Sequence, residues 1–389
     1  MPPPRHGHVT ECGRCGCVLA GRATGLVTAP LALTLAALLL LLPACVAPLM
    51  IVNTYGSVRK SWLPSGVVAM WTDGFPSLAV VVGTFSIALP AIFMGLLIWV
   101  LGSLREGRGE SFGPVFRWVQ ILRPWVMIEV FLIGCFVAYS RIKVISTVDV
   151  GVGGWCLIAA TLVLMVALTQ LDERTVWEAA PLSKGARRAA EGEPTIACSV
   201  CDFLAMRTAQ RQRCPRCHAR LHLRKPDSMR RTTALVVAGY ALYIPANTLP
   251  VLIIVRFGRE DNNTILSGVM ELIHNHLWPL AVIVFAASIV LPLVKLFGLT
   301  WMLIATARGS RRHLTGRTRF YRIIDLVGRW SNIDVFMVSV LAAVLQFGAV
   351  TSVHAGDGLV AFAAVVLLTM IATEAFDSRL MWDLRERHA

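Results

Sequence analysis

Four cysteines in the middle of the chain are the clearest candidates for chemistry. Cys198, Cys201, Cys214 and Cys217 form two C-x2-C pairs, twelve residues apart, in a polar and basic stretch. Paired thiolates at this spacing are typical ligands of a tetrahedral Zn²⁺ ion. Because four thiolates fill the coordination shell and leave no place for a catalytic water, we expect the Zn²⁺ to be structural and to fold a small zinc ribbon.

Two other interpretations of these cysteines stay open, an iron or redox centre and free thiols. Disulfides are not expected if this linker is cytosolic, because the cytosol keeps thiols reduced. His218 and His222 adjoin the second pair. Since four cysteines already complete the shell, we interpret both histidines as surface residues.

A weaker metal candidate lies at the N-terminus. Cys12 and Cys15 precede the second pair of the ribbon by 202 positions, and no first pair precedes them. The side chains that could complete a site there are His6, His8 and Cys17. The N-terminal segment is therefore predicted to hold half of a second ribbon.

Five polar residues of the second half stand in or beside long apolar runs. They are Ser288, Lys295, Ser331, Asp334 and Thr369. An ionisable side chain in a membrane is costly and needs a partner or a role. A Lys295–Asp334 pair surrounded by hydroxyls is geometrically reasonable. One interpretation is a proton-linked switch or a polar lining for the path of a lipid headgroup, and the other is an ion pair that only fixes helix packing.

Long apolar runs place the chain among membrane proteins. Only 15% of its 389 residues are charged, against roughly 25% in soluble proteins, and the mean hydropathy is +0.65. Runs long enough to cross a bilayer predict eight spans. They lie near 29–51, 77–101, 124–143, 153–171, 232–255, 278–304, 333–353 and 358–375.

The basic residues predict the orientation of these spans. The net charge of +14 is concentrated in every second gap between the apolar runs. This is the positive-inside pattern, which favours membrane insertion over nucleic-acid binding. We therefore expect both termini and the central linker to be cytosolic, with no nucleic-acid partner. The membrane is expected to be a bacterial inner membrane, as the family resemblance described below implies.

The two halves of the chain repeat each other. Pro43 and Pro48 recur 202 positions later, and Trp125 and Glu129 recur as Trp330 and Asp334, 205 positions later. An internal duplication explains the match. With four spans each, both halves have the same orientation, which makes a parallel repeat. The predicted fold is an all-α membrane protein. Its expected segments are an N-terminal part (1–28), a first four-helix unit (29–175), the ribbon linker (176–230), a second unit (231–383) and a tail (384–389).

The polar cluster is not repeated in the first half. Phe93 stands in place of Lys295, and Val126 and Leu164 replace Ser331 and Thr369. If the cluster is functional, the second half carries the activity and the first is closer to a scaffold.

Several motifs resemble one known family. The ribbon is followed by the segments 243–247, 288–295, 328–336 and 376–383, with the sequences YIPAN, SIVLPLVK, GRWSNIDVF and FDSRLMWD. Together they resemble the paraquat-inducible protein A family over about residues 12–383. The resemblance implies zinc ribbons, two four-helix units in the inner membrane, and a role with periplasmic MCE-domain tunnel proteins in handing on phospholipids. The chain departs from the family pattern in its half ribbon and in Cys45, which stands where the second half has Asn247.

Two rival functions remain at this stage. One is a membrane scaffold or envelope-stress sensor whose ribbon docks a cytosolic partner. The other is a redox enzyme, which the absence of haem, flavin or nucleotide motifs disfavours. No G-x-x-x-x-G-K-[ST] motif is present, so we expect a protein that is not an ATPase or another enzyme.

Overall fold

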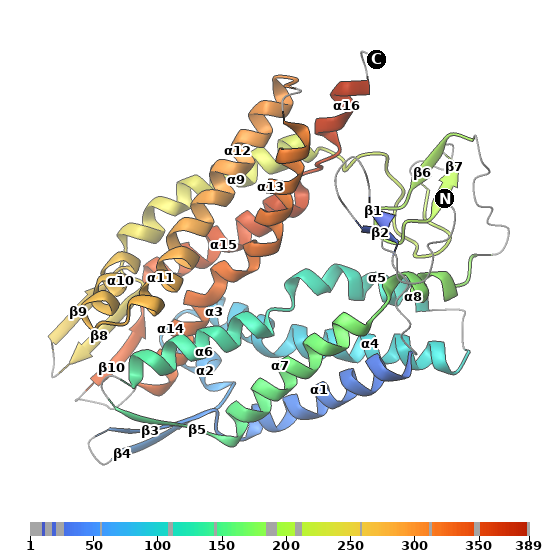
Figure 1. Ribbon diagram of the computed structural model, residues 1–389. Coiled ribbons are helices and arrows are strands. Elements are labelled where there is room, and N and C mark those ends of the chain that lie inside the picture. The colour runs from blue at the N-terminus through green and yellow to red at the C-terminus, as the bar shows by residue number, and fades with distance from the viewer. Residues whose placement is uncertain are drawn as a thin grey trace.

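The computed structural model of the chain is mostly helical, with small antiparallel sheets (Figure 1). It describes residues 10–11, 18–20, 27–54, 57–107, 112–143, 146–183, 193–206, 212–256, 259–310, 313–345 and 351–386. Cys12 and Cys15 fall outside these residues. Two short strands, β1 (Thr10–Glu11) and β2 (Val18–Ala20), pair on either side of them.

The first half begins with a long helix and ends with a short one. Its helices are α1 (Thr28–Val46), α2 (Ser65–Thr72), α3 (Pro76–Gly83), α4 (Leu89–Arg105), α5 (Phe112–Leu122), α6 (Ile128–Ile142), α7 (Val152–Gln170) and α8 (Glu173–Ala179). Its strands are β3 (Met50–Thr54), β4 (Ser57–Ser61) and β5 (Thr147–Val150). A π-helical segment, η1 (Thr84–Ala88), joins α3 to α4, and a 3₁₀ turn, η2 (Arg123–Trp125), follows α5.

The second half has the same elements in the same order. Its helices are α9 (Ser228–Thr248), α10 (Ile265–His274), α11 (Trp278–Phe285), α12 (Leu291–Ala307), α13 (Leu314–Val327), α14 (Ile333–Val344), α15 (Asp357–Ala375) and α16 (Leu380–Glu386). Its strands are β8 (Leu252–Arg256), β9 (Arg259–Asn263) and β10 (Thr351–Ala355). The π-helical segment is η4 (Ala286–Val290), and the 3₁₀ turn is η5 (Gly328–Asn332). Between the halves lies the hairpin of β6 (Thr195–Ala197) and β7 (Leu204–Met206).

Seven helical segments among the described residues are long and apolar enough to cross a membrane. They are Thr28–Val46, Pro76–Arg105, Phe112–Ile142, Val152–Gln170, Trp278–Ala307, Leu314–Val344 and Asp357–Ala375. The remaining expected span, 232–255, overlaps α9. Although α9 has 21 residues, it is not among the seven, and it begins with polar residues that include Arg230 and Arg231.

The strands correct the all-α prediction. Residues counted as the ends of spans 29–51, 232–255 and 333–353 form β3, β8 and β10. The helices before β3 and β8 stop because a residue that precedes proline is pushed out of the α region. Ala47, before Pro48, has φ −84° and ψ 156°, and Leu249, before Pro250, has φ −81° and ψ 152°. The β-branched residues that follow favour strands.

Two helices also fill gaps that were expected to be basic loops. α5 precedes α6 and α13 precedes α14, and each pair forms one 31-residue membrane-span candidate. The basic residues of α13, including Arg317, lie on a helix that packs against α12 and α15. The expected spans 124–143 and 333–353 thus cover only the second helix of each pair.

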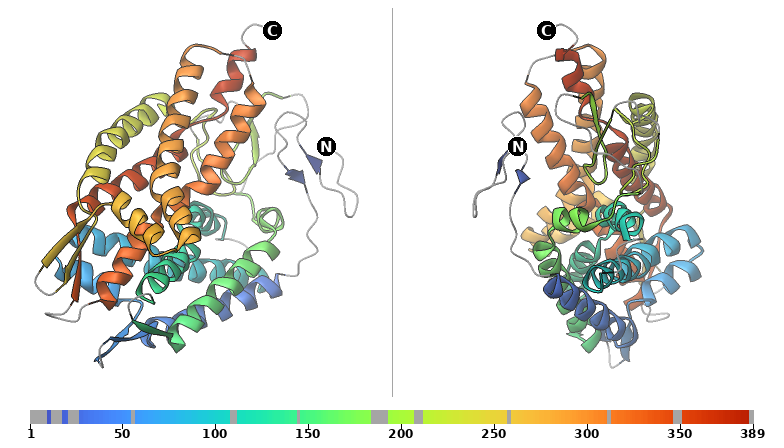
Figure 2. Two further views of the ribbon diagram at one scale, coloured as in Figure 1. Left: turned by 60° about the vertical axis from the view of Figure 1, so that its left-hand side comes forward. Right: turned by 90° about the vertical axis from the view of Figure 1, so that its right-hand side faces the viewer.

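The two halves pack through α6 and α14. The rings of Phe131 and Phe336 meet edge to face with centroids 5.3 Å apart. Gly134 permits this close approach, since a Cβ at this position would lie 2.9 Å from the Cβ of Phe336. Farther along, His354 Nδ1 lies 2.9 Å from Asp73 Oδ1. Each half has one three-stranded antiparallel sheet, with the strand order β4-β3-β5 in the first half and β10-β8-β9 in the second. Figures 1 and 2 show these sheets at one end of the helices and the β6–β7 hairpin with the C-terminus at the other.

Candidate functional site

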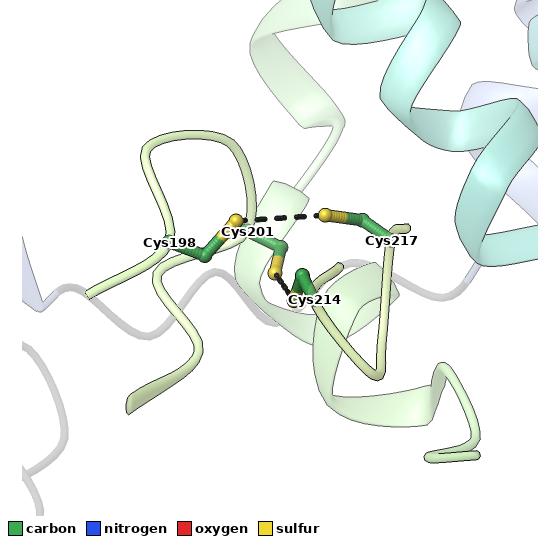
Figure 3. A group of neighbouring side chains, drawn as sticks. All are labelled: Cys198, Cys201, Cys214 and Cys217. Atoms are coloured by element: carbon green, nitrogen blue, oxygen red, sulfur yellow. Dashed lines mark hydrogen bonds between the residues drawn. The ribbon is translucent and has the colours of Figure 1, made fainter. Parts of the chain in front are cut away.

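The four central cysteines converge as the sequence predicts. Their Sγ atoms all lie within 4.8 Å of one another, and all four residues are buried (Figure 3). Cys198 and Cys217 are 3.5 Å apart, as are Cys201 and Cys214. A tetrahedral site with Zn–S bonds of about 2.3 Å needs sulfur atoms about 3.8 Å apart. The cluster therefore has the ligand set and the size to hold a metal ion.

Two matching turns present these thiols. The residue after each second cysteine of a pair, Asp202 (φ 52°) or His218 (φ 58°), adopts the left-handed conformation. Each turn is closed by a backbone hydrogen bond to the carbonyl of the pair's first cysteine, at 3.1 Å from Asp202 and 2.9 Å from His218. Hydrogen bonds from the other thiols, that of Cys201 foremost, hold the pKa of Cys198 well below its ordinary value. A thiolate is the form that binds a metal.

The cysteine cluster is attached to both halves. On the first half, Arg117 Nη1 donates to the His218 carbonyl (3.1 Å), and a Cβ on Gly113 would collide with the carbonyl oxygen of Arg216. On the second half, the segment after the cluster binds the C-terminal region. Arg224 Nε donates to Asp383 Oδ2 (2.6 Å), and the backbone N–H of Lys225 donates to Asp377 Oδ2 (3.0 Å).

Lys295 and Asp334 are both buried, at 2% and 3% exposure, but they do not pair with each other. The Lys295 ammonium donates to the Gly328 carbonyl (2.6 Å) and lies 3.5 Å from Thr369 Oγ1. Both carboxylate oxygens of Asp334 lack a hydrogen-bond partner among the described residues. The ion pair that the sequence suggested is therefore not formed.

The charge that faces Asp334 comes from the first half and was not predicted. Arg141, near the end of α6, interacts electrostatically with Asp334 and Glu271. Both Arg141 and Asp334 line a cavity of about 30 Å³, and Arg141 Nη2 contacts the Gly268 carbonyl at 3.4 Å. The sequence marked Arg141 only as a basic residue at an expected outer end of a span, because nothing in its own segment points to α14.

Ser288 lies in the π-helical segment η4, fully buried, and donates to the Val284 carbonyl (2.6 Å). Ser86 in η1 donates to the Val82 carbonyl in the same way (2.7 Å). In each half a proline follows four residues later, and it lacks the N–H that would bond to the carbonyl of the serine. Widening of the helix into a π turn accommodates this loss, and such π turns often occur at functional sites.

A cavity with several charged residues in its lining opens beside Lys295. It has a volume of about 370 Å³, and its lining includes Lys295, Gly328, Asp325, Arg322 and Glu374. Ser331 and Thr369 are both buried, at 1% exposure each, and the Ser331 hydroxyl is without a hydrogen-bond partner among the described residues. The structure thus brings Thr369 to Lys295 but does not bring Asp334 to either of them.

Comparison with known proteins establishes the family. The family model described as paraquat-inducible protein A matches residues 27–180 and 229–386, one segment in each half. The chain belongs to the paraquat-inducible protein A family. It is 30% identical to the Intermembrane transport protein PqiA of Escherichia coli (strain K12), over 98% of this chain and 93% of the relative.

Other relatives in the paraquat-inducible protein A family also carry names that refer to transport or a tunnel. The Lipophilic envelope-spanning tunnel protein A of E. coli is 33% identical over 72% of this chain and 64% of its own length. The Probable intermembrane transport protein of Haemophilus influenzae is 24% identical over 97% of this chain and 91% of its own. No solved structure matches the chain.

Proposed function

We propose that the chain is the inner-membrane component of a lipid transport system, and that it hands phospholipids between the inner membrane and a periplasmic tunnel of MCE-domain proteins. One observation carries the proposal: the carboxylate of Asp334 is buried in a segment long and apolar enough to cross a membrane, and it has no hydrogen-bond partner in the part of the chain that the structure describes. An unpaired buried carboxylate is costly. Two relatives are named as intermembrane transport proteins, which supports transport as the function that explains the buried carboxylate.

In this proposal Lys295, together with Thr369, and Asp334 act at successive steps of one transport path. The cavity beside Lys295 admits a lipid headgroup or water to the buried ammonium, and the hydroxyl of Thr369 lies within reach of the same ammonium. Asp334 then takes up a proton or a cation in one step and releases it in another. The lipid tails stay in the bilayer, so only the headgroup needs a polar route.

The finer architecture belongs to the same proposal. We infer eight spans in two parallel four-helix units, with α9 as the eighth, both termini cytosolic, and a Zn²⁺ ion in the cysteine cluster. The identical element order of the two halves and the twofold match of the family model support the parallel units. The cysteines then lie in the cytosol, and the two three-stranded sheets face the periplasm.

Two substitutions test the transport role. We expect Lys295→Ala and Asp334→Ala each to abolish transport, because each removes one charge of the path, while the protein still accumulates in the membrane. The measurement is envelope integrity in cells that lack the native gene and carry each variant, with immunoblots of membrane fractions. Normal envelope integrity in both variants would reject the path.

A second experiment tests the partners. The detergent-solubilised chain is purified by affinity, and the same sample is analysed for proteins, lipids and metals. An MCE-domain protein, phospholipid and about one zinc ion per chain, the number that one four-thiolate site binds, are the expected result. A soluble regulatory partner without lipid would instead favour the scaffold or sensor function, and iron would favour a redox centre.

A further inference from the structure

An apolar groove in the first half lies outside the polar path of the second. It has a volume of about 620 Å³ and lies between α6 and α7, beside β3 and β5. Its floor includes the buried residues Leu49 and Leu157, and its rim carries Phe136 and Trp155, which are 59% and 63% exposed. Pockets that hold small molecules measure roughly 300–1,000 Å³, so the groove has room for an acyl chain.

A basic residue, Lys143, lies next to Tyr139, one of the residues that line the groove. Phe136 and Tyr139 line the groove from α6, and Lys143 follows Tyr139 by four residues, which places it on the same helical face. The Lys143 ammonium lies 5.6 Å from the centre of the Tyr139 ring. Lys143 is exposed and ends α6 close to β5. An apolar groove with a cation beside it matches the two parts of a phospholipid, an acyl chain and a phosphate.

At the position equivalent to Phe136, the second half is closed. Leu341 corresponds to Phe136 by the duplication, and it is 3% exposed because α14 is buried between the halves. Phe136 by contrast points away from the core. The groove therefore results from the different packing of α6 and α14 and is not a general feature of the repeat.

We propose that this groove binds one phospholipid, with an acyl chain between α6 and α7 and the phosphate at Lys143. The inference rests on the proposed function, since the proposed orientation places β5 and Lys143 at the periplasmic surface. The lipid is then one of the outer leaflet, on the side where a periplasmic tunnel would receive it. Lipid tails are as apolar as leucine side chains, so burial of an acyl chain in the groove adds little binding energy within a bilayer. The groove therefore selects by shape, and the contact between Lys143 and the phosphate provides most of the selectivity.

Two variants with matched controls test the groove. Lys143→Glu reverses the charge at the headgroup, and Ile158→Trp fills the groove. Their controls are Lys60→Glu, an exposed lysine on β4, and Leu162→Trp, which is 57% exposed on α7 and does not line the groove. The full-length chain in detergent is mixed with dioleoylphosphatidylglycerol or with dioleoylglycerol, which lacks the phosphate, and retained lipid is counted by native mass spectrometry.

We expect the native chain to retain one phosphatidylglycerol and little dioleoylglycerol. Lys143→Glu should lower this retention about tenfold, the size of effect that loss of one charge-assisted contact produces. Ile158→Trp should also lower it, because the indole occupies the space of the acyl chain, while both controls retain the lipid. Equal retention in all five chains, or equal retention of both lipids, would mean annular lipid only and would overturn the inference. Normal lipid transport in cells lacking the protein would instead reject the proposed function, whatever the groove retains.

Discussion

Ser86 and Ser288 occupy equivalent positions in the two halves. A structural role should be common to both serines, whereas a role in transport should belong to Ser288 alone. Ser86 and Ser288 are both buried in π-helical segments and donate to carbonyls four residues earlier. Their surroundings differ, because Asp334 and Lys295 belong to the second half, while Phe93 occupies the position of Lys295 in the first. The hydroxyl of Ser288 is therefore the one that can serve the polar path.

We expect Ser288→Ala to lower transport, and Ser86→Ala to leave it near the native level. Each substitution removes one neutral hydrogen bond and should cost a similar stability of about 1 kcal/mol. The measurement is envelope integrity, compared with the thermal unfolding midpoint of each purified variant. Equal loss of function in both variants would assign both serines to helix packing.

At the scale of elements, the four-cysteine unit around β6 and β7 is the part whose folding we expect to depend on a bound metal. β6 and β7 contribute only three residues each, and two left-handed turns hold the thiols together. Such a small unit has little core of its own, and a structural metal commonly supplies the missing stability. The contacts of this unit with α5 on one side and with α16 on the other connect the metal site to both halves.

Removal of one ligand tests the metal centre. We expect Cys214→Ser to lose the bound zinc and to lower the unfolding midpoint, because a structural Zn²⁺ contributes several kcal/mol, about 10 or more in isolated zinc-finger peptides. Cys156→Ser is the control, since Cys156 lies in α7 outside the cluster. Metal content is measured by elemental analysis, and an unchanged content in the Cys214 variant would contradict the assignment.

At the scale of the whole molecule, the halves are coupled by groups that lie far apart in the sequence. α6 packs on α14, and Arg141 of the first half faces Asp334 of the second. The charge balance of the proposed path is thus set by both halves. In this proposal the first half is more than a scaffold, because it supplies Arg141, whose charge acts on the Asp334 carboxylate.

A double-mutant cycle measures this coupling. We expect Arg141→Gln and Asp334→Asn to be non-additive in the free energy of unfolding, with an interaction of about 0.5–3 kcal/mol, as is usual for residues coupled through a shared cavity. Lys143→Gln combined with Asp334→Asn is the control, because Lys143 lies on the same helix and is exposed. Additive effects in the Arg141 cycle would show that the two charges do not interact.

Local patterns were enough to predict much of this protein. The spacing of Cys198, Cys201, Cys214 and Cys217 predicted their convergence, because ligand spacing in a short hairpin constrains the geometry directly. Apolar runs predicted most membrane helices, because a bilayer demands a fixed length of apolar chain. The motifs predicted the family.

Only the tertiary structure decided which buried groups meet. The Lys295 ammonium bonds to the Gly328 carbonyl, so the pair expected from the helical positions does not form, and Arg141 and Asp334, from different halves, line the same small cavity. Strands β3, β8 and β10 were counted as helix because hydropathy alone does not distinguish a β-branched strand from the end of a span. The groove beside Lys143 likewise depends on how α6 packs, and no local pattern records the packing of one helix against another.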